Sequence, residues 1–168
     1  MICGRILEVG PCQNGLSKYL SSFNYQSLDK DKEFTTYKMD VQNITIDGVF
    51  DLIYVSHVLE YVENDILAVS ELAKILNKNG KIVIQEAIFG IPETKWGYVI
   101  NIPTHLKHIY IEPIRSYGVD IKNRLKASGL LVSVIDVHQV FDLEKYAISN
   151  PEDGFLYVCT KNKRRQRN

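Results

Sequence analysis

Short apolar runs alternate along the chain with longer segments whose apolar residues recur at helical spacing. Apolar runs of this length between turn residues predict seven β-strands. They fall at Arg5–Val9, Tyr25–Leu28, Thr35–Met39, Phe50–Val55, Lys81–Ala87, Leu130–Val137 and Phe155–Thr160. The helical spacing predicts helices at Leu16–Phe23, Asn64–Asn77 and Val119–Ser128. Strands that alternate with helices are typical of α/β proteins. We therefore predict a doubly wound, Rossmann-like, seven-stranded and mostly parallel sheet with helices on both faces.

Two segments interrupt this alternation. Residues 138–154 are polar and carry no evident helix, so a long hairpin would make the last strand antiparallel to its neighbours. Residues 88–116 contain Pro92, Pro103 and Pro113 and exceed a typical connection in length. Connections of this kind are often lids or binding segments. The pattern predicts one domain over residues 1–160, with an insert at 88–116 and a tail at 161–168.

Composition and charge are those of an ordinary globular protein. The chain has 168 residues, of which 45% are hydrophobic and 24% charged. The net charge is zero, but five of the twenty basic residues lie in the last eight positions. Residues 1–160 thus hold fifteen basic and twenty acidic residues. A basic tail can contact nucleic acid, but the body offers no companion basic face, so we favour a solvated terminus and expect no nucleic-acid partner.

Several further classes are disfavoured by the sequence. No apolar stretch is long enough to span a bilayer, and the first residues lack the layout of a signal peptide. Cys3, Cys12 and Cys159 are too few and too irregularly spaced for a disulfide framework or a zinc site. We therefore expect a cytoplasmic protein that has no membrane partner. A protein partner or a homo-oligomer remains open.

The ends of the first four strands carry the candidate chemistry, because ligands of open α/β sheets bind at the carboxyl ends of the strands. Gly10 ends the first strand and lets the backbone approach a ligand. Asp29 follows nineteen residues later, where an acidic side chain usually binds the hydroxyls of a ribose. Asp40 ends the third strand and can accept a hydrogen bond from an exocyclic amine such as that of adenine. Together they predict a ligand that contains a nucleoside.

Several motifs carry a resemblance to a known family, and they occur in its order and spacing across residues 5–87. They are Ile6–Pro11 (ILEVGP), Ser27–Asp29 (SLD), Met39–Val41 (MDV), Phe50–Val62 (FDLIYVSHVLEYV) and Leu76–Ile84 (LNKNGKIVI). The sequence of these segments resembles class I S-adenosylmethionine-dependent methyltransferases. Residues 119–137 are similar to the last helix and sixth strand of that family.

The resemblance implies a role for each matching residue. The loop after the first strand would hold the methionine end of the cofactor, Asp29 the ribose, and Asp40 with its neighbours the adenine. The residues implied in cofactor binding are Glu8, Gly10, Pro11, Cys12, Asp29, Met39, Asp40, Val41, Ser56 and His57. Glu60 and Tyr61 are expected to steer the entry of the following helix rather than to take part in chemistry.

The glycine-rich loop departs from the family pattern. Cys12 and Asn14 stand where glycines are usual, and Gly15 comes one position later. These changes favour an alternative function, a non-catalytic methyltransferase-like subunit that serves a partner protein. Asp29 and Asp40 oppose that alternative. A nicotinamide dehydrogenase is disfavoured because the chain has no Gly-x-Gly-x-x-Gly motif.

The acceptor is less defined than the cofactor. We expect O-methylation of a small molecule or glycan-like acceptor, and the absence of Asn-Pro-Pro-Tyr after the fourth strand argues against DNA amino groups.

His57 and His105 are the candidate catalytic bases, because histidine titrates near neutral pH. His105 and His108 lie three residues apart without a carboxylate pattern, so no metal site is predicted. Aromatic residues of the insert either line an acceptor pocket or pack on the sheet; they are Phe89, Trp96, Tyr98 and Tyr110.

Overall fold

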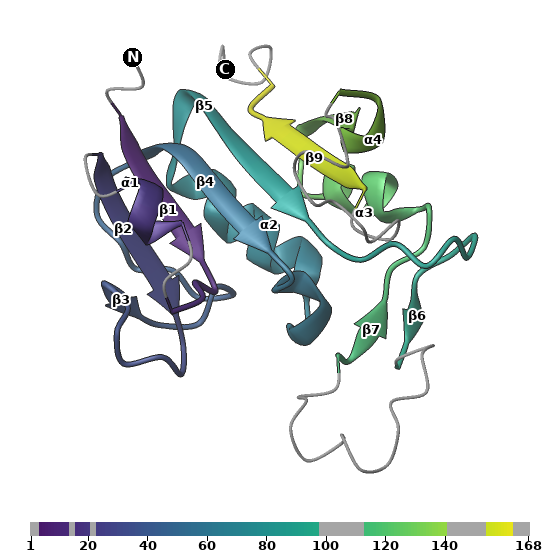
Figure 1. Ribbon diagram of the computed structural model, residues 1–168, viewed down its shortest axis with the longest axis horizontal. Coiled ribbons are helices and arrows are strands. Elements are labelled where there is room, and N and C mark those ends of the chain that lie inside the picture. The colour runs from purple at the N-terminus through teal and green to yellow at the C-terminus, as the bar shows by residue number, and fades with distance from the viewer. Residues whose placement is uncertain (1–3, 14–15, 21–22, 98–112, 141–153, 163–168) are drawn as a thin grey trace.

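The computed structural model describes residues 4–13, 16–20, 23–97, 113–140 and 154–162. Its main sheet has seven strands in the order β3-β2-β1-β4-β5-β9-β8 (Figure 1). Their bounds are β1 Arg5–Val9, β2 Asn24–Asp29, β3 Tyr37–Lys38, β4 Phe50–Ser56, β5 Leu76–Gln85, β8 Leu131–Asp136 and β9 Phe155–Thr160. The predicted Rossmann-like, mostly parallel sheet is confirmed.

The last strand is antiparallel, as the sequence predicts. The neighbouring pairs among β1 to β5 are all parallel, whereas β9 runs antiparallel to both β5 and β8. It lies between these two strands and not at an edge, so it joins β8 to the rest of the sheet. Lys161, one residue beyond β9, donates a hydrogen bond from Nζ to the carbonyl oxygen of Leu76 at 2.6 Å, which ties the end of β9 to the start of β5.

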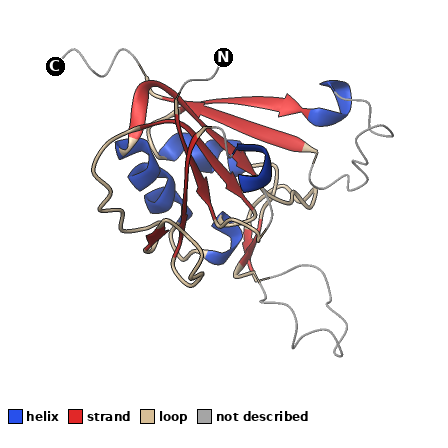
Figure 2. Ribbon diagram, turned by 60° about the vertical axis from the view of Figure 1, so that its left-hand side comes forward, coloured by secondary structure: helices blue, strands red, loops and turns tan. Residues whose placement is uncertain are grey.

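Helices pack on both faces of the sheet, as Figures 1 and 2 show. Helices α2 (Asp65–Lys74) and α3 (Ile121–Ala127) lie behind the sheet in Figure 1, and the short α1 (Ser17–Leu20) lies in front. A four-residue helix, α4 (Val137–Val140), follows β8. The core lies between the sheet and α2 and α3, where Leu72 and Ile121 are fully buried against strand residues such as Ile53 and Ile82. Burying one such side chain stabilises the fold by about 1.5–3 kcal/mol.

The boundary between α2 and β5 differs from the prediction. The helix begins after Asn64, whose side chain accepts a hydrogen bond from the Leu67 amide at 2.9 Å, but it ends at Lys74. Strand β5 starts at Leu76, where the sequence predicted continued helix, and Asn79-Gly80 lies inside the strand. A Cβ on Gly80 would come within 2.9 Å of the Phe50 carbonyl oxygen, so glycine is needed there for close strand packing and not as a helix stop.

The described part of the insert forms a small second sheet. Strand β6 (Lys95–Trp96) pairs antiparallel with β7 (Arg115–Ser116), and residues 98–112 between them lie outside the described residues. The sequence did not predict these short strands, because two residues show no periodicity. Within the described residues, no helix has the length and hydropathy needed to cross a membrane.

Candidate active site

The strand ends named by the sequence analysis meet at one edge of the sheet. Val9 of β1 pairs with Leu28 of β2 on one side and with Val55 of β4 on the other. Each of these residues is followed directly by a candidate site residue, namely Gly10, Asp29 and Ser56. Because the three strands are parallel and in register at this point, the three candidates lie along the carboxyl edge of the sheet.

Gly10 has a backbone conformation that suits glycine. Its φ is +71°, in the left-handed region, and its amide donates a hydrogen bond to the Leu28 carbonyl oxygen at 2.9 Å. A Cβ at this position would lie 2.4 Å from Cγ2 of Val58, so the loop after β1 lies directly against the segment after β4. Any side chain here would push these two segments apart.

Replacing Gly10 by alanine is expected to lower the free energy of unfolding by about 1–3 kcal/mol, from left-handed strain together with overpacking against Val58. Urea unfolding followed by circular dichroism measures the loss. The double variant G10A/V58A removes the overlap and keeps the strain. In the V58A background, the G10A change should therefore lower the free energy of unfolding by less than it does in the wild type. Equal differences would contradict the proposed overlap.

The rest of the loop after β1 is only partly described. Glu8, on β1, is buried, and its Oε2 accepts a hydrogen bond from the hydroxyl of Tyr25. Pro11 is buried and Cys12 is an exposed free thiol. The thiol therefore points away from the core, beside the strand ends. Residues 14 and 15, the other departure from the glycine-rich pattern, lie outside the described residues.

Asp29 is held as an oriented carboxylate at the end of β2. Its Oδ1 accepts hydrogen bonds from the amides of Asp31 at 2.9 Å and Lys32 at 3.2 Å, and its Oδ2 lies 3.0 Å from Nζ of Lys32. Partial burial alone would raise the pKa of Asp29, but these hydrogen bonds and the Lys32 charge outweigh it and lower the pKa below its ordinary value. The side chain is therefore charged at neutral pH, with its position set by backbone amides.

Asp40 lies next to Asp29 at the same edge. The amide of Met39 donates to the Asp29 carbonyl oxygen at 3.2 Å, which places the end of β3 beside the end of β2. Oδ1 of Asp40 accepts from the Gln42 amide at 2.7 Å. Its two sequence neighbours are apolar: Val41 is buried in the core, and Met39 packs against that core.

His57 follows β4 in a left-handed conformation, with φ +51°. Its amide donates to the Gln85 carbonyl oxygen at 2.9 Å, which fixes the turn against the end of β5. Nδ1 of His57 lies 3.5 Å from Oε1 of Glu60, a residue of the 3₁₀ turn η1 (Leu59–Tyr61). Glu60 is buried, whereas the His57 side chain is 37% exposed, so the imidazole faces solvent and the carboxylate stands behind it.

Glu86 lies beside this pair and is fully buried. Its Oε1 accepts hydrogen bonds from the amides of Val58 at 3.1 Å and Leu59 at 2.9 Å, while its Oε2 has no hydrogen-bond partner among the described residues. Burial raises the pKa of Glu86 to about 8, the nearby charge of Glu60 adds to this rise, and the two backbone hydrogen bonds oppose it. One potential ligand atom from each of His57, Glu60 and Glu86 lies within 4.8 Å of the others.

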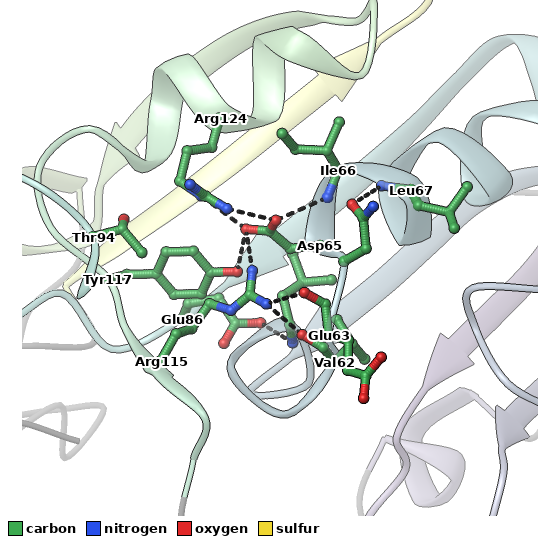
Figure 3. A network of polar contacts seen from close by, with 12 residues as sticks. Val62, Glu63, Asp65, Ile66, Leu67, Glu86, Thr94, Arg115, Tyr117 and Arg124 are labelled. Carbon is green, nitrogen blue, oxygen red and sulfur yellow. Dashed lines mark hydrogen bonds and ion pairs between the residues drawn. The ribbon is translucent and has the colours of Figure 1, made fainter. Parts of the chain in front are cut away.

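A buried ion-pair network joins this edge to the insert, as Figure 3 shows. Asp65, the first residue of α2, contacts Nη1 of Arg115 at 2.7 Å, Nη2 of Arg124 at 2.7 Å and the Tyr117 hydroxyl at 2.9 Å. Arg115 also donates to the carbonyl oxygen of Glu63 at 2.7 Å. The Arg115–Asp65 contact is an ion pair whose alignment does not meet hydrogen-bond geometry. The network therefore links α2 and α3 with β7 and the end of the η1 turn.

The described part of the insert lies beside the η1 turn, at the carboxyl edge of the sheet. The amide of Ile114 donates to the Glu60 carbonyl oxygen at 2.9 Å. Trp96 is 74% exposed, and the Arg115 guanidinium lies 5.0 Å from the centre of its ring. The predicted base His105, with His108, Tyr98 and Tyr110, lies outside the described residues. A shallow hollow near Lys126 and Leu131 lies instead at the start of β8, at the opposite edge.

Sequence reasoning missed two carboxylates of the site. Glu60 was expected to steer helix entry, yet its side chain lies against His57. Glu86 lies inside the segment predicted as the fifth strand, Lys81–Ala87, and so received no predicted role. The fifth strand ends at the same edge as the first four, so the rule that ligands bind at strand ends also points to Glu86.

The fold and this edge define a class of protein. A Rossmann-like sheet with a glycine turn after β1 and carboxylates ending β2 and following β3 matches the architecture expected of class I S-adenosylmethionine-dependent methyltransferases. A family model described as a methyltransferase domain matches residues 7–84, which span β1 to β5. This match, together with the sheet and its strand ends, agrees with the predicted methyltransferase class and its S-adenosylmethionine cofactor.

Solved structures share the fold at low sequence identity. The glycopeptide N-methyltransferase MtfA has a TM-score of 0.68 and 14% identity, over 96% of this chain and 85% of that one. An S-adenosylmethionine-dependent methyltransferase from Clostridium acetobutylicum has a TM-score of 0.65 and 14% identity, over 94% and 84% of the two chains. DesVI of Streptomyces venezuelae has a TM-score of 0.64 and 12% identity, over 96% of this chain and 85% of that one. The comparison with curated proteins found no match.

Proposed function

We propose that this enzyme methylates a hydroxyl oxygen of a small-molecule or glycan-like acceptor bound beside His57. The observation that carries the proposal is the His57–Glu60 pair at the end of β4, with 3.5 Å between Nδ1 and Oε1. A carboxylate on one ring nitrogen favours a proton there and leaves Nε2 able to accept another. A hydroxyl acceptor needs such a base, because its oxygen becomes a strong nucleophile only as its proton leaves.

We propose that the other strand ends hold the cofactor. Oδ2 of Asp29 carries only the Lys32 ion pair among the described contacts, so it has lone pairs left for a ribose hydroxyl. Asp40, which precedes the buried Val41 in the sequence, is suited to the adenine amine. Gly10, Pro11 and Cys12 would lie along the methionine end together with Glu8 and Ser56.

In this arrangement the methyl group would move in one displacement. The acceptor oxygen would form a bond to the methyl carbon as the carbon–sulfur bond breaks, and the sulfur would keep the electron pair of that bond. The acceptor proton passes to the imidazole of His57. The protein's own contribution is mainly alignment, since the reactive group belongs to the cofactor.

The structural neighbours support acceptors of modest size. One neighbour is described as a glycopeptide N-methyltransferase. Another, a Haemonchus contortus phosphoethanolamine N-methyltransferase with a TM-score of 0.58 and 13% identity, was solved with phosphomonomethylethanolamine; the match covers 97% of this chain and 50% of that one.

The free cysteines of the described residues, Cys12 and Cys159, agree with our proposal of a reducing cytoplasmic location.

The proposal is tested in two steps. Calorimetry should show that S-adenosylhomocysteine binds with one site, and the ligand should raise the melting temperature, because it binds only the folded state. The protein is then incubated with S-adenosylmethionine and matched panels of hydroxyl and amine acceptors, and the release of S-adenosylhomocysteine is measured. Turnover of amines alone would reject the hydroxyl acceptor. Binding without any turnover would favour the non-catalytic subunit.

The variant His57→Gln is expected to lower the rate of methyl transfer by about 10²–10⁴-fold, the usual contribution of a general base. The affinity for S-adenosylhomocysteine should change little, since the ring faces the acceptor side. His138→Gln, which changes an exposed histidine of α4, is the matched control and should retain the wild-type rate. A His57→Gln enzyme with near wild-type turnover would remove His57 from the reaction.

A further inference from the structure

Three side chains at the acceptor edge converge in a way that the proposed reaction does not fully use. Each of His57, Glu60 and Glu86 offers one potential ligand atom, and these atoms lie within 4.8 Å of one another. They come from the end of β4, the η1 turn and the end of β5, which are fixed by backbone hydrogen bonds. The Nδ1–Oε1 distance of 3.5 Å between His57 and Glu60 is close to the separation of two ligands on one metal ion, about 3.3 Å for bonds of about 2.0 Å.

The two carboxyl groups are buried close to each other, which is electrostatically unfavourable when both are ionised. Glu60 and Glu86 are 5% and 0% exposed, so two negative charges would repel each other here, where water screens little. Oε1 of Glu86 is satisfied by two amides, but Oε2 is buried without a hydrogen-bond partner among the described residues. A buried oxygen of this kind is expected to have a partner, and a proton alone would still leave its O–H without an acceptor.

We propose that His57, Glu60 and Glu86 form a binding site for a divalent transition cation such as Mn²⁺ or Zn²⁺. One imidazole and two carboxylates suit these ions, whereas Mg²⁺ prefers oxygen ligands alone. Three protein ligands leave coordination positions open. Because His57 is the exposed member of the three, the open positions face solvent at the edge where an acceptor would bind.

The cation would give this site a second means of activating a hydroxyl. An acceptor oxygen that binds at an open position loses its proton to water more readily, since the cation stabilises the resulting alkoxide. His57 serves as a base in the cation-free site and as a ligand when the cation is bound. This role rests on the proposed function, but binding of the cation does not.

The test uses the full-length protein, stripped with EDTA, in a Cys12→Ser background that removes the exposed thiol as a competing ligand. Calorimetric titration with MnCl₂ and with ZnCl₂ should each show one site, and MgCl₂ should bind more weakly. Glu86→Gln keeps an oxygen for the two amides and loses the ligand charge. Glu60→Gln makes the same change beside His57. Each variant should bind Mn²⁺ at least tenfold more weakly.

Glu71→Gln is the matched control, because Glu71 is a buried acid of α2 that pairs with Lys74 away from the cluster. Its affinity for Mn²⁺ should equal that of the parent. No Mn²⁺ or Zn²⁺ binding at millimolar cation, or equal binding by the parent, Glu86→Gln and Glu60→Gln, overturns the site. If circular dichroism shows that Glu86→Gln does not fold, the Mn²⁺ affinity of Glu60→Gln alone tests the site. Binding of Mn²⁺ by the parent, with no binding of S-adenosylhomocysteine by the wild-type protein, keeps the site and rejects the proposed function.

Discussion

Replacing Asp65 by alanine should lower the free energy of unfolding by about 3–5 kcal/mol, the largest loss of stability expected from any single substitution considered for this protein. Asp65 is buried and receives two guanidinium groups and a tyrosine hydroxyl. Its removal leaves the Arg115 charge, 2% exposed, without its anion. The penalty comes from that stranded charge more than from the lost attraction.

Urea unfolding at neutral pH, followed by circular dichroism, measures this loss. Glu63→Ala is the matched control, because Glu63 lies in the same turn with an exposed side chain and contributes only its backbone oxygen to Arg115. That control should stay within about 0.5 kcal/mol of the wild type. A loss below about 1 kcal/mol for Asp65→Ala would show that Arg115 finds another partner or reaches water.

The same carboxylate predicts a pH dependence. Burial alone would raise the pKa of Asp65, but Arg124, Arg115 and the Tyr117 hydroxyl outweigh it and lower the pKa from 3.8 to about 2. The unfolded chain therefore binds a proton before the folded one, and stability falls as the pH drops from about 4 to about 2. The contribution of ionised Asp65 to the free energy of unfolding should fall by about 2 kcal/mol across that pH range. The difference between wild type and Asp65→Ala should shrink there, and a constant difference would contradict the shifted pKa.

Replacing Asp29 by alanine should weaken S-adenosylhomocysteine binding at least tenfold. Charge-assisted hydrogen bonds are worth about 1.5–3 kcal/mol each, and a ribose offers two hydroxyls to this carboxylate. The pKa of Asp29 is lowered overall, because the Asp31 and Lys32 amides and the Lys32 charge outweigh the opposing effect of burial. The wild-type side chain is thus ionised before the ligand arrives. Isothermal titration calorimetry gives the affinity.

Two companion variants separate binding from local structure. Asp29→Asn keeps an oxygen for the Asp31 and Lys32 amides but loses the charge, so it should bind more weakly than wild type and fold normally. Asp31→Ala changes an exposed neighbour and should bind as wild type does. Unchanged affinity in Asp29→Ala would make Asp29 a turn residue and move the ribose elsewhere.

Strand ends were the part of the site that the sequence could predict. Gly10, Asp29 and Ser56 each lie at the end of a strand predicted from the sequence, and parallel register alone brings such positions to one edge. The strands themselves were predictable for the same reason, since Arg5–Val9 and Phe155–Thr160 are bounded by abrupt changes in polarity.

Side-chain convergence across long separations was not predictable. The Asp65–Arg115 pair joins residues fifty positions apart, and nothing in either local sequence marks a buried charge. Glu60 and Glu86 meet only because η1 packs against the end of β5. The end of α2 was also misplaced, because Ile75 and Leu76 continue its apolar pattern although Leu76 already pairs with Phe50 in the sheet. Tertiary pairing overrides helix propensity there.

The position of β9 has a consequence for how the chain folds during synthesis. Its two partners, β5 and β8, precede it in the sequence, yet β9 fills the gap between them. Until residues 155–160 leave the ribosome, β5 has an unpaired edge and β8 has no strand to join. Contacts across such separations form slowly, and open edges recruit other chains. A nascent chain stalled before residue 155 should therefore be the most aggregation-prone species of this protein, and the arrival of the last strand closes the sheet.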